Sequence, residues 1–278
     1  MTTTTKDPEI GKSVQAAGLA TNYLEEGSGD PVVLLHGSGP GVTGYANWRF
    51  TIPVLARHFR VLAPDAAGFG YTERKAGQTF TLDAWLDHLE AFLDAVGVEK
   101  AHFVGNSFGG ALTVGLAARA PQRVGRFVLM GAAGLEFELT EGLDAVWGHE
   151  PSVENARRMM TEYFAFNADL ITDDLVRSRY EASIRPGFHE SFSAMFPAPR
   201  QRHIAALATP EDKLAAMQNR AMIVHGRDDK VVPLETSLRY HQLLRNSDLH
   251  VFGNCGHWTQ IEKRDQFNAM VSDFFRAD

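Results

Sequence analysis

The chain has 278 residues, 44% of them hydrophobic, and a formal net charge of −7, so it can bury a large core but disfavours a nucleic-acid partner. The one cysteine, Cys255, excludes an intrachain disulfide and fits a reducing compartment, and no apolar run approaches the roughly 18 residues of a membrane span. The polar N-terminus lacks the hydrophobic segment of a signal peptide, and together these features predict a cytoplasmic protein without a membrane partner.

Short apolar runs alternate with longer amphipathic stretches along most of the chain. The segment Val14–Glu26 predicts an antiparallel lead-in strand or hairpin. Further strands are predicted at Val32–Leu35, Val61–Leu62, His102–Val104, Phe127–Met130, Met222–Val224 and Leu249–Phe252. Helices are predicted at Leu82–Val96, Ala111–Ala120, Thr236–Leu244 and Arg264–Phe275. This alternation is typical of an α/β fold with a mostly parallel sheet and helices on both faces.

The alternation stops in one long segment, residues 134–207. The segment contains no good strand pattern and is rich in aromatic residues and methionine. We therefore predict a core domain made of residues 1–133 and 208–278, with residues 134–207 inserted as a helical lid over the carboxyl edge of the sheet.

A nucleophile motif follows the predicted strand that ends at Val104. Gly105-Asn106-Ser107-Phe108-Gly109 has the form G-x-S-x-G and comes directly before a predicted helix. In this context the motif forms a sharp turn that exposes the serine hydroxyl at the top of the sheet, and its glycines allow the close approach of neighbouring backbone. The strand–turn–helix context favours Ser107 as the nucleophile of a hydrolase.

A glycine-rich turn follows the earlier predicted strand Val32–Leu35. It reads His36-Gly37-Ser38-Gly39-Pro40-Gly41. In hydrolases with this elbow, such a turn supplies one backbone N–H of the oxyanion hole, and the residue after the nucleophile supplies the other. Those residues are Ser38 and Phe108 here. The turn lacks the lysine of a phosphate-binding P-loop.

A serine hydroxyl needs an adjacent base, and His257 lies in the loop after the last predicted strand. The chain order of serine, acid and histidine in this fold places the acid after the preceding strand, where Asp228 and Asp229 both occur. We choose Asp229, since related sequences place this acid four residues before the proline, here Pro233. Cys255 is interpreted as a small packing residue rather than a nucleophile.

The histidines and the single cysteine show no ligand spacing typical of a metal site, so we expect no metal and no cofactor. Asp65, after a predicted strand, is interpreted as a strand-end or turn residue rather than a second acid.

The chain resembles the meta-cleavage product hydrolases, α/β-hydrolases that break carbon–carbon bonds in ring-fission products of catechols. The resemblance extends over nearly the whole chain and is strongest to the 2-hydroxymuconate semialdehyde hydrolases. It is carried by the segments 36–41 with Asn47, 105–110, 256–258, 140–148 and 179–188. The last two are the more specific, because the lid varies most within this fold.

The resemblance implies roles for individual residues. Ser107, Asp229 and His257 match the catalytic triad, and Ser38 and Phe108 match the oxyanion hole. Arg179 matches the arginine that holds the 2-oxo and carboxylate end of the substrate. Asn47, Asn106 and Trp258 match polar residues around that end. The planar guanidinium of Arg179 can donate two parallel hydrogen bonds to a carboxylate. It would therefore provide a positive charge for the anionic substrate in a protein that is acidic overall.

The implied substrate is a small anionic dienoate of the 2-hydroxy-6-oxohexa-2,4-dienoate type, cleaved to 2-hydroxypenta-2,4-dienoate and a carboxylic acid. The implied reaction is ketonisation followed by hydrolysis, either through an acyl-enzyme or by direct attack of water. The resemblance also implies a homo-oligomer, a dimer or larger. Two other interpretations stay open: a carboxylesterase with the same triad, and a catalytically silent ligand-binding protein. The substituent at the reacting carbonyl is open as well.

Overall fold

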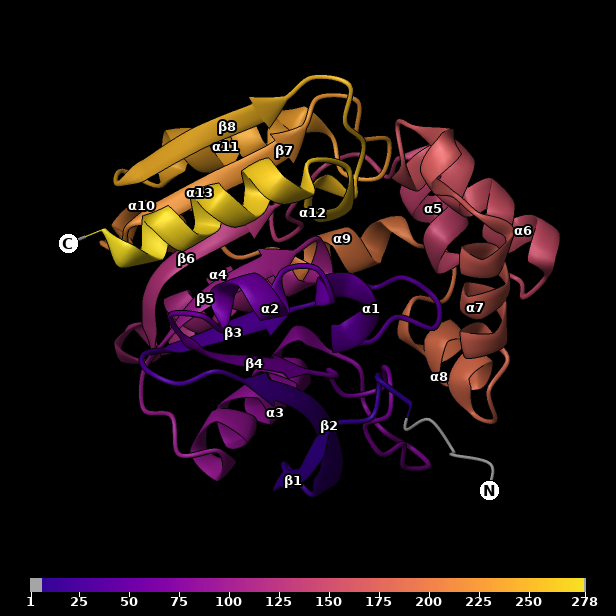
Figure 1. Cartoon of the computed structure of the whole chain (residues 1–278), viewed down its shortest axis with the longest axis horizontal. Coiled ribbons are helices and arrows are strands. Elements are labelled where there is room, and N and C mark those ends of the chain that lie inside the picture. Colours follow the sequence, from indigo (N-terminus) through magenta and orange to yellow (C-terminus); the bar gives the residue numbers. More distant parts are fainter. Residues whose placement is uncertain (1–6, 278) are drawn as a thin grey trace.

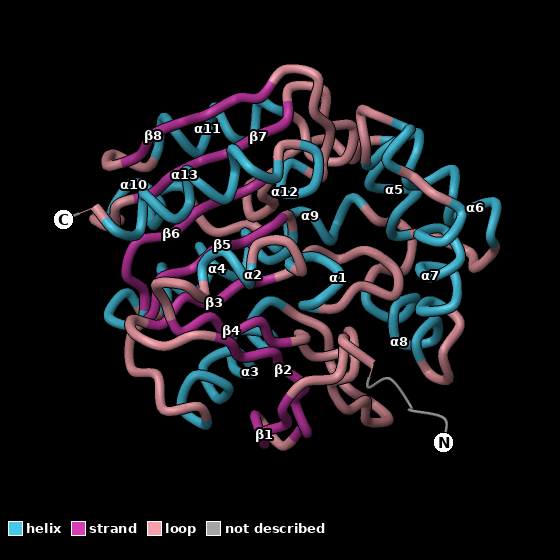
Figure 2. Tube along the Cα trace, in the orientation of Figure 1, coloured by secondary structure: helices cyan, strands magenta, loops and turns pink. Residues whose placement is uncertain are grey.

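The computed structural model describes residues 7–277, and its centre is an eight-stranded sheet (Figures 1 and 2). The strands are β1 (Lys12–Ala16), β2 (Leu19–Glu26), β3 (Pro31–Leu35), β4 (Arg60–Pro64), β5 (Ala101–Asn106), β6 (Val124–Met130), β7 (Ala221–Gly226) and β8 (Ser247–Phe252). Their order across the sheet is β1-β2-β4-β3-β5-β6-β7-β8. β2 runs antiparallel to β1 and to β4, and the other neighbours are parallel. The predicted hairpin and parallel strands are therefore confirmed.

The central strands are buried on both faces, which explains their continuous apolar sequences. Along β3, Val33 and Leu35 pack into one core cluster, whereas Val32 and Leu34 pack into the other. Successive side chains of a strand point to opposite faces, so the residues of one apolar run pack alternately into the two core clusters. β8 lies at the edge of the sheet and is partly exposed.

Helices cover both faces of the sheet (Figure 1). The larger cluster holds side chains of α3 (Leu82–Ala95), α4 (Phe108–Arg119) and α11 (Leu234–Leu243). The other holds side chains of α1 (Gly44–Trp48), α2 (Ile52–Leu55) and α13 (Arg264–Arg276). The four predicted helices are confirmed, with small shifts of their ends. Other short helical elements are η1 (Pro121–Arg123) and α12 (Thr259–Glu262).

The segment between β6 and β7 forms helices and loops and contains no strand in the described chain (Figure 2). Its elements are α5 (Glu141–Trp147), α6 (Val153–Arg158), η2 (Met159–Phe164), η3 (Ala168–Leu170), α7 (Asp173–Ser183), α8 (Phe188–Met195), α9 (Gln201–Leu207) and α10 (Glu211–Ala216). The helices α5 to α8 gather beyond the carboxyl ends of the parallel strands (Figure 1). The division into a core and a lid at residues 134 and 207 remains a prediction.

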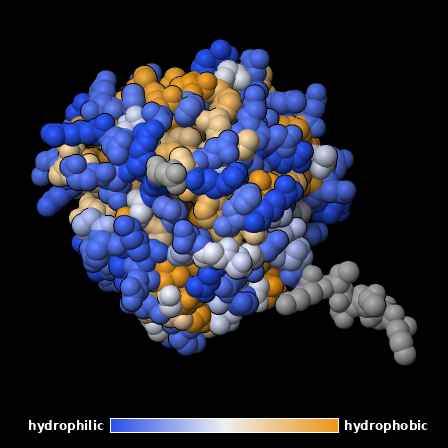
Figure 3. Space-filling view, turned by 60° about the vertical axis from the view of Figure 1, so that its left-hand side comes forward, coloured by the Kyte–Doolittle hydropathy of each residue, from blue (hydrophilic) through white to orange (hydrophobic). Residues whose placement is uncertain are grey.

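Polar side chains cover most of the face shown in Figure 3, and its hydrophobic residues occur in small patches. No helix within residues 7–277 is both long and apolar enough to cross a membrane.

Candidate active site

Ser107 occupies a strained turn between β5 and α4, with φ of 52° and ψ of −115°. The glycines on either side are required by close contacts. A Cβ on Gly105 would lie 2.4 Å from the carbonyl oxygen of Gly109, and a Cβ on Gly109 would lie 2.2 Å from that of Leu35. Such strain at a serine between a strand and a helix is typical of a nucleophile elbow. Ser107 also caps α4, where the helix dipole favours developing negative charge.

The glycine-rich turn after β3 lies against this elbow, because β3 and β5 are neighbours in the sheet. A Cβ on Gly37 would lie 3.4 Å from the Cβ of Ser107. The next residue, Ser38, accepts a hydrogen bond through Oγ from Trp147 Nε1 at 3.0 Å. Ser38 and Phe108 both line a cavity together with Ser107. The structure thus brings both residues predicted for the oxyanion hole close to Ser107.

Asp229 is the aspartate that contacts His257. Its Oδ2 lies 2.7 Å from His257 Nδ1, while Oδ1 accepts hydrogen bonds from the backbone N–H groups of Val231 and Val232 at 2.7 and 3.0 Å. Asp228 instead accepts a hydrogen bond from the backbone N–H of Cys255. Of the two aspartates that the sequence motif offers, the structure places Asp229 in hydrogen-bond contact with His257.

The surroundings of Asp229 keep its carboxylate ionised. Burial opposes the charge, but the charge and hydrogen bond of His257, the charge of His225 and the Val231 N–H together hold the pKa of Asp229 below its ordinary value. An ionised Asp229 fixes a proton on His257 Nδ1 and leaves Nε2 free to act as a base. Burial lowers the pKa of the neighbouring His225, whose Nε2 donates to the carbonyl of Val232.

The loop that carries His257 is held by the segment between β6 and β7, which we call the inserted segment. The backbone N–H of His257 donates to the carbonyl of Phe164 at 2.8 Å, and the ring of Phe164 stacks on those of His257 and Trp258. Gly131 lies close to the pair formed by Asp229 and His257. A Cβ on Gly131 would lie 3.1 Å from Asp229 Oδ2 and 3.2 Å from His257 Nδ1. Gly131, at φ of 49°, is therefore a site residue that sequence analysis missed.

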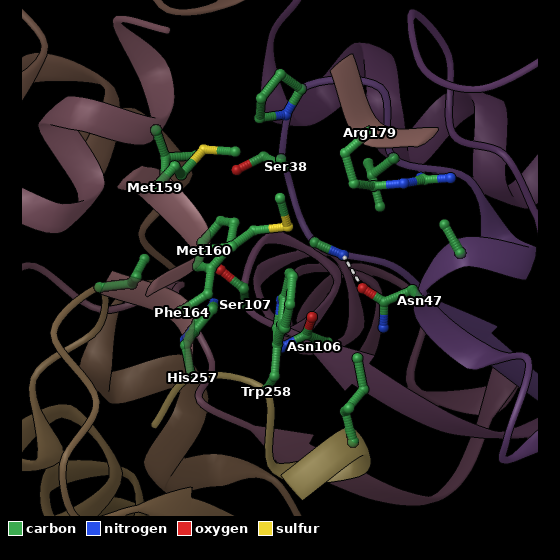
Figure 4. A pocket seen from close by; sticks show the side chains of 18 of the residues that line it. Ser38, Asn47, Asn106, Ser107, Met159, Met160, Phe164, Arg179, His257 and Trp258 are labelled. Carbon is green, nitrogen blue, oxygen red and sulfur yellow. Dashed lines mark hydrogen bonds between the residues drawn. The ribbon is translucent and has the colours of Figure 1, made fainter. Parts of the chain in front are cut away.

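Ser107 and His257 face a cavity of about 740 Å³ including its mouth (Figure 4). Apolar side chains of the inserted segment form one wall: Leu143, Val146, Met159, Met160, Phe164 and Leu175. The other predicted pocket residues also line it: Ser38, Asn47, Asn106, Arg179 and Trp258. Arg49 and Gln260 line it too and were not predicted. Seven of the nine predicted site residues, from distant parts of the chain, thus line one cavity, and the other two are Phe108 and Asp229.

Arg179 lies across this cavity from His257, and its guanidinium points away from Ser107 (Figure 4). Its Nη2 donates to Glu9 Oε1 at 2.7 Å and its Nη1 donates to the carbonyl of Gly41 at 3.2 Å. Glu9 Oε2 also contacts Arg185 Nη2 at 3.2 Å. The arginine is therefore present at the cavity but paired with a carboxylate from the N-terminal segment.

A second, smaller cavity lies at Ser107; it is almost wholly apolar and has room for little more than one water molecule. Its lining comprises Ser38, Ser107, Phe108, Ala133, Phe137, Leu143, Trp147, Ile204, Leu207 and Val232. The ring of Trp147 stacks on Phe196 at a centroid distance of 4.3 Å, which fixes one wall. Ser107 thus lies between a large cavity with a polar end and a small apolar one.

Cys255 and Asp65, which the sequence indicates as structural residues rather than catalytic ones, are both buried. Cys255 is buried, and burial raises the pKa of its thiol to about 12. Asp65 is buried and accepts hydrogen bonds from the backbone N–H groups of Gly44 and Tyr71 and from Asn22 Nδ2. No group of three potential metal-ligating side chains occurs among the residues that the structure describes.

Comparison with known proteins places this site in a family. The alpha/beta hydrolase fold family matches residues 30–264. The chain is 54% identical over 275 residues to a 2-hydroxy-6-oxo-2,4-heptadienoate hydrolase of Pseudomonas putida, covering 99% of each chain. It is 52% identical to a 2-hydroxymuconate semialdehyde hydrolase of a Pseudomonas species, covering 96% of this chain and 94% of the relative.

A solved structure extends the comparison to three dimensions. The meta-cleavage product hydrolase of Pseudomonas fluorescens superimposes with a TM-score of 0.96 at 55% identity, covering 97% of this chain and 98% of the other. The match spans the sheet and the inserted segment alike. The chain therefore belongs to the α/β-hydrolase family and, within it, to the carbon–carbon bond hydrolases of meta-cleavage products.

Proposed function

We propose that this protein hydrolyses the carbon–carbon bond of 2-hydroxy-6-oxohexa-2,4-dienoates that carry hydrogen or a small alkyl group at the reacting carbonyl. The products are 2-hydroxypenta-2,4-dienoate and a carboxylic acid, formate for the semialdehyde. The observation that carries the proposal is the position of Ser107 between two unlike cavities. The larger has arginine and amide side chains at its far end, and the smaller is apolar.

The polarity of the two cavities supports one direction in which the substrate lies. Its carboxylate end fits the far end of the larger cavity, near Asn47 and Arg179, because these side chains donate hydrogen bonds to anions. The reacting carbonyl then lies at Ser107, and its substituent enters the smaller cavity. The small volume there supports hydrogen or methyl over a ring, in line with the names of the two relatives.

The proposed reaction begins with ketonisation of the dienol, in which the hydroxyl proton leaves and a proton is gained at the carbon next to the far carbonyl. The resulting 2-oxo group can accept the electrons of the carbon–carbon bond. Ser107, deprotonated by His257, attacks the far carbonyl, and the N–H groups of Ser38 and Phe108 stabilise the oxyanion. Collapse breaks the carbon–carbon bond, the electron pair of that bond passes to the 2-oxo group, and the proton held by His257 passes to the leaving dienolate. One water then releases the acyl group from Ser107 as the carboxylic acid.

The first experiment mixes the purified protein, without added metal or cofactor, with the yellow ring-fission product of catechol. We expect rapid loss of the visible absorbance with release of one formate per substrate, and weak turnover of p-nitrophenyl acetate in parallel. Strong ester hydrolysis with no loss of the yellow colour would instead establish a carboxylesterase. Absence of both activities, with Ser107 unreactive toward a fluorophosphonate, would favour a ligand-binding protein.

A substituent series tests the smaller cavity. The ring-fission products of catechol, 3-methylcatechol and a biphenyl diol place hydrogen, methyl and phenyl at the reacting carbonyl. We expect kcat/KM to fall by at least about tenfold for phenyl, since a ring has to displace the packed wall around Trp147. Equal values for all three would show that the smaller cavity does not select the substituent.

The proposal includes a homo-oligomer and a cytoplasmic location. The family resemblance supports the oligomer, and the single cysteine supports a reducing compartment. Light scattering of the purified protein tests the first, and cell fractionation of the native host tests the second.

A further inference from the structure

Two buried amide side chains at the far end of the larger cavity have unpaired polar atoms. Gln260, on α12, is 1% exposed, and its Nε2 donates to the backbone carbonyl of Asn47 at 3.4 Å. Its Oε1 has no hydrogen-bond partner among the described residues, and neither has Nδ2 of Asn47. Both side chains line the cavity that contains Ser107 and His257.

An unpaired polar atom in a buried position costs free energy, so a group that enters the cavity and pairs with both atoms is favoured. Gln260 Oε1 can only accept a hydrogen bond, and Asn47 Nδ2 can only donate. The complementary ligand group therefore carries a donor beside an acceptor. A carboxylate alone has no donor, whereas a carboxylate with a hydroxyl on the adjacent carbon has both.

We propose that Gln260 binds the 2-hydroxyl group of the dienol substrate through Oε1, while Asn47 Nδ2 donates to the adjacent carboxylate. This inference rests on the proposed function and names a residue that recognises one tautomer. The dienol presents an O–H to Gln260, whereas the 2-oxo form presents only an acceptor. Gln260 therefore selects the dienol on entry and fixes the 2-hydroxy end relative to Ser107.

Three stable acids test this assignment as competitive inhibitors of p-nitrophenyl acetate hydrolysis. They differ only at the carbon next to the carboxylate. 2-Hydroxyhexanoate has a hydrogen-bond donor there, hexanoate has no polar group, and 2-oxohexanoate has only an acceptor. We expect the wild-type protein to bind the hydroxy acid at least about fivefold more tightly than the other two. In Gln260→Met, which keeps the length of the side chain but removes Oε1, the three inhibition constants should become equal.

The matched control is Ile261→Val, which changes a neighbouring wall of the cavity without altering a polar atom. It should shift all three constants together and keep the preference for the hydroxy acid. Gln260→Leu serves as the second variant if the methionine variant does not fold. A structural role for Gln260 predicts that its variants lose affinity for all three acids equally, and that result overturns the assignment.

Cleavage of the catechol product separates this inference from the proposed function. If the wild-type protein cleaves the dienoate but binds the oxo acid as tightly as the hydroxy acid, the role of Gln260 is wrong and the proposed function stands. If the dienoate is not cleaved and none of the acids inhibits ester hydrolysis, the proposed function is wrong and the assignment of Gln260 is overturned with it.

Discussion

Glu9 and Arg179 form an ion pair of 2.7 Å between segments that are 170 residues apart in the sequence. Glu9 is 6% exposed, and its second oxygen contacts Arg185. Gly41 and Ser178 accept further hydrogen bonds from the Arg179 guanidinium. The guanidinium therefore has most of its donors occupied, and a substrate carboxylate that needs two of them competes with Glu9.

Replacement of Arg179 should weaken binding of the anionic end of the substrate. We expect Arg179→Ala to raise KM for the catechol product at least about tenfold and to slow ketonisation, because the 2-oxo and carboxylate groups lose their cation. Stopped-flow absorbance separates the ketonisation step from cleavage. Arg177→Ala is the matched control, since Arg177 is exposed on the same helix and does not line the cavity. Equal kinetics of the two variants would show that Arg179 is not the anchor.

Neutralising Glu9 should have the opposite effect on substrate affinity. We expect Glu9→Gln to lower KM for the dienoate about threefold or more, because a negative charge beside the bound carboxylate is removed. Its melting temperature should fall, since Arg179 and Arg185 lose their shared partner. Asp7→Asn is the control: Asp7 lies on the same segment but accepts a hydrogen bond from Tyr71. A raised KM in Glu9→Gln would show that Glu9 instead holds Arg179 in position.

Loss of the nucleophile should separate binding from cleavage. Ser107→Ala removes the hydroxyl at the strained turn and keeps the residues that line the far end of the cavity. We expect kcat for cleavage to fall by at least about 10⁴-fold, with the dissociation constant of the dienoate changed less than about threefold. Titration of the yellow substrate measures that constant through its change in absorbance. Full turnover by the variant would refute the nucleophile assignment.

The two adjacent aspartates allow a sharp test of the acid. Asp229→Asn replaces the ionised partner of His257 Nδ1 with an amide that does not fix the same tautomer. We expect kcat to fall about 10³- to 10⁴-fold. Asp228→Asn, whose side chain contacts Cys255 N–H instead, should stay within about threefold of the wild-type protein. Similar losses in both variants would mean that the loop as a whole, and not the Asp229 carboxylate, supports activity.

The sequence predicted those features of the fold that a local pattern carries. β3 is a continuous apolar run, and β5, β6 and β7 each contain a shorter one, because both faces of each strand are covered. The turn at Ser107 was predictable because only glycine fits where Gly105 and Gly109 meet neighbouring backbone. Helices of four or five residues, such as α1, α2 and α12, are too short to show a helical period.

Other features depend on contacts that no local pattern records. Glu9 precedes the first strand among ordinary polar residues, so nothing in its own segment indicates an arginine from α7. The need for glycine at position 131 arises from Asp229 and His257, which lie far away in the sequence. Gln260 follows the His257-Trp258 pair by two residues, a position that could have drawn attention to it. Its unpaired oxygen, however, is visible only in three dimensions.

Buried histidines should make the stability of the protein fall in mild acid, and His88 offers a clean test. His88 is 4% exposed, and its Nε2 lies 2.8 Å from Thr21 Oγ1. Burial lowers the pKa of His88 to about 4, so between pH 6.5 and 4 the unfolded chain binds a proton that the folded protein does not. The contribution of neutral, buried His88 to the free energy of unfolding is therefore fully present above about pH 6.5 and is lost as the pH falls toward 4.

His88→Gln keeps a hydrogen-bonding group opposite Thr21 but cannot titrate. Between pH 7 and pH 4.5 we expect the free energy of unfolding of this variant to fall by about 2 kcal/mol less than that of the wild-type protein. Urea denaturation at the two pH values measures the difference. His250→Gln is the matched control, because His250 lies on the exposed edge strand β8. An equal loss in the His88 variant and the wild-type protein would show that His88 takes up its proton equally in the folded and unfolded states.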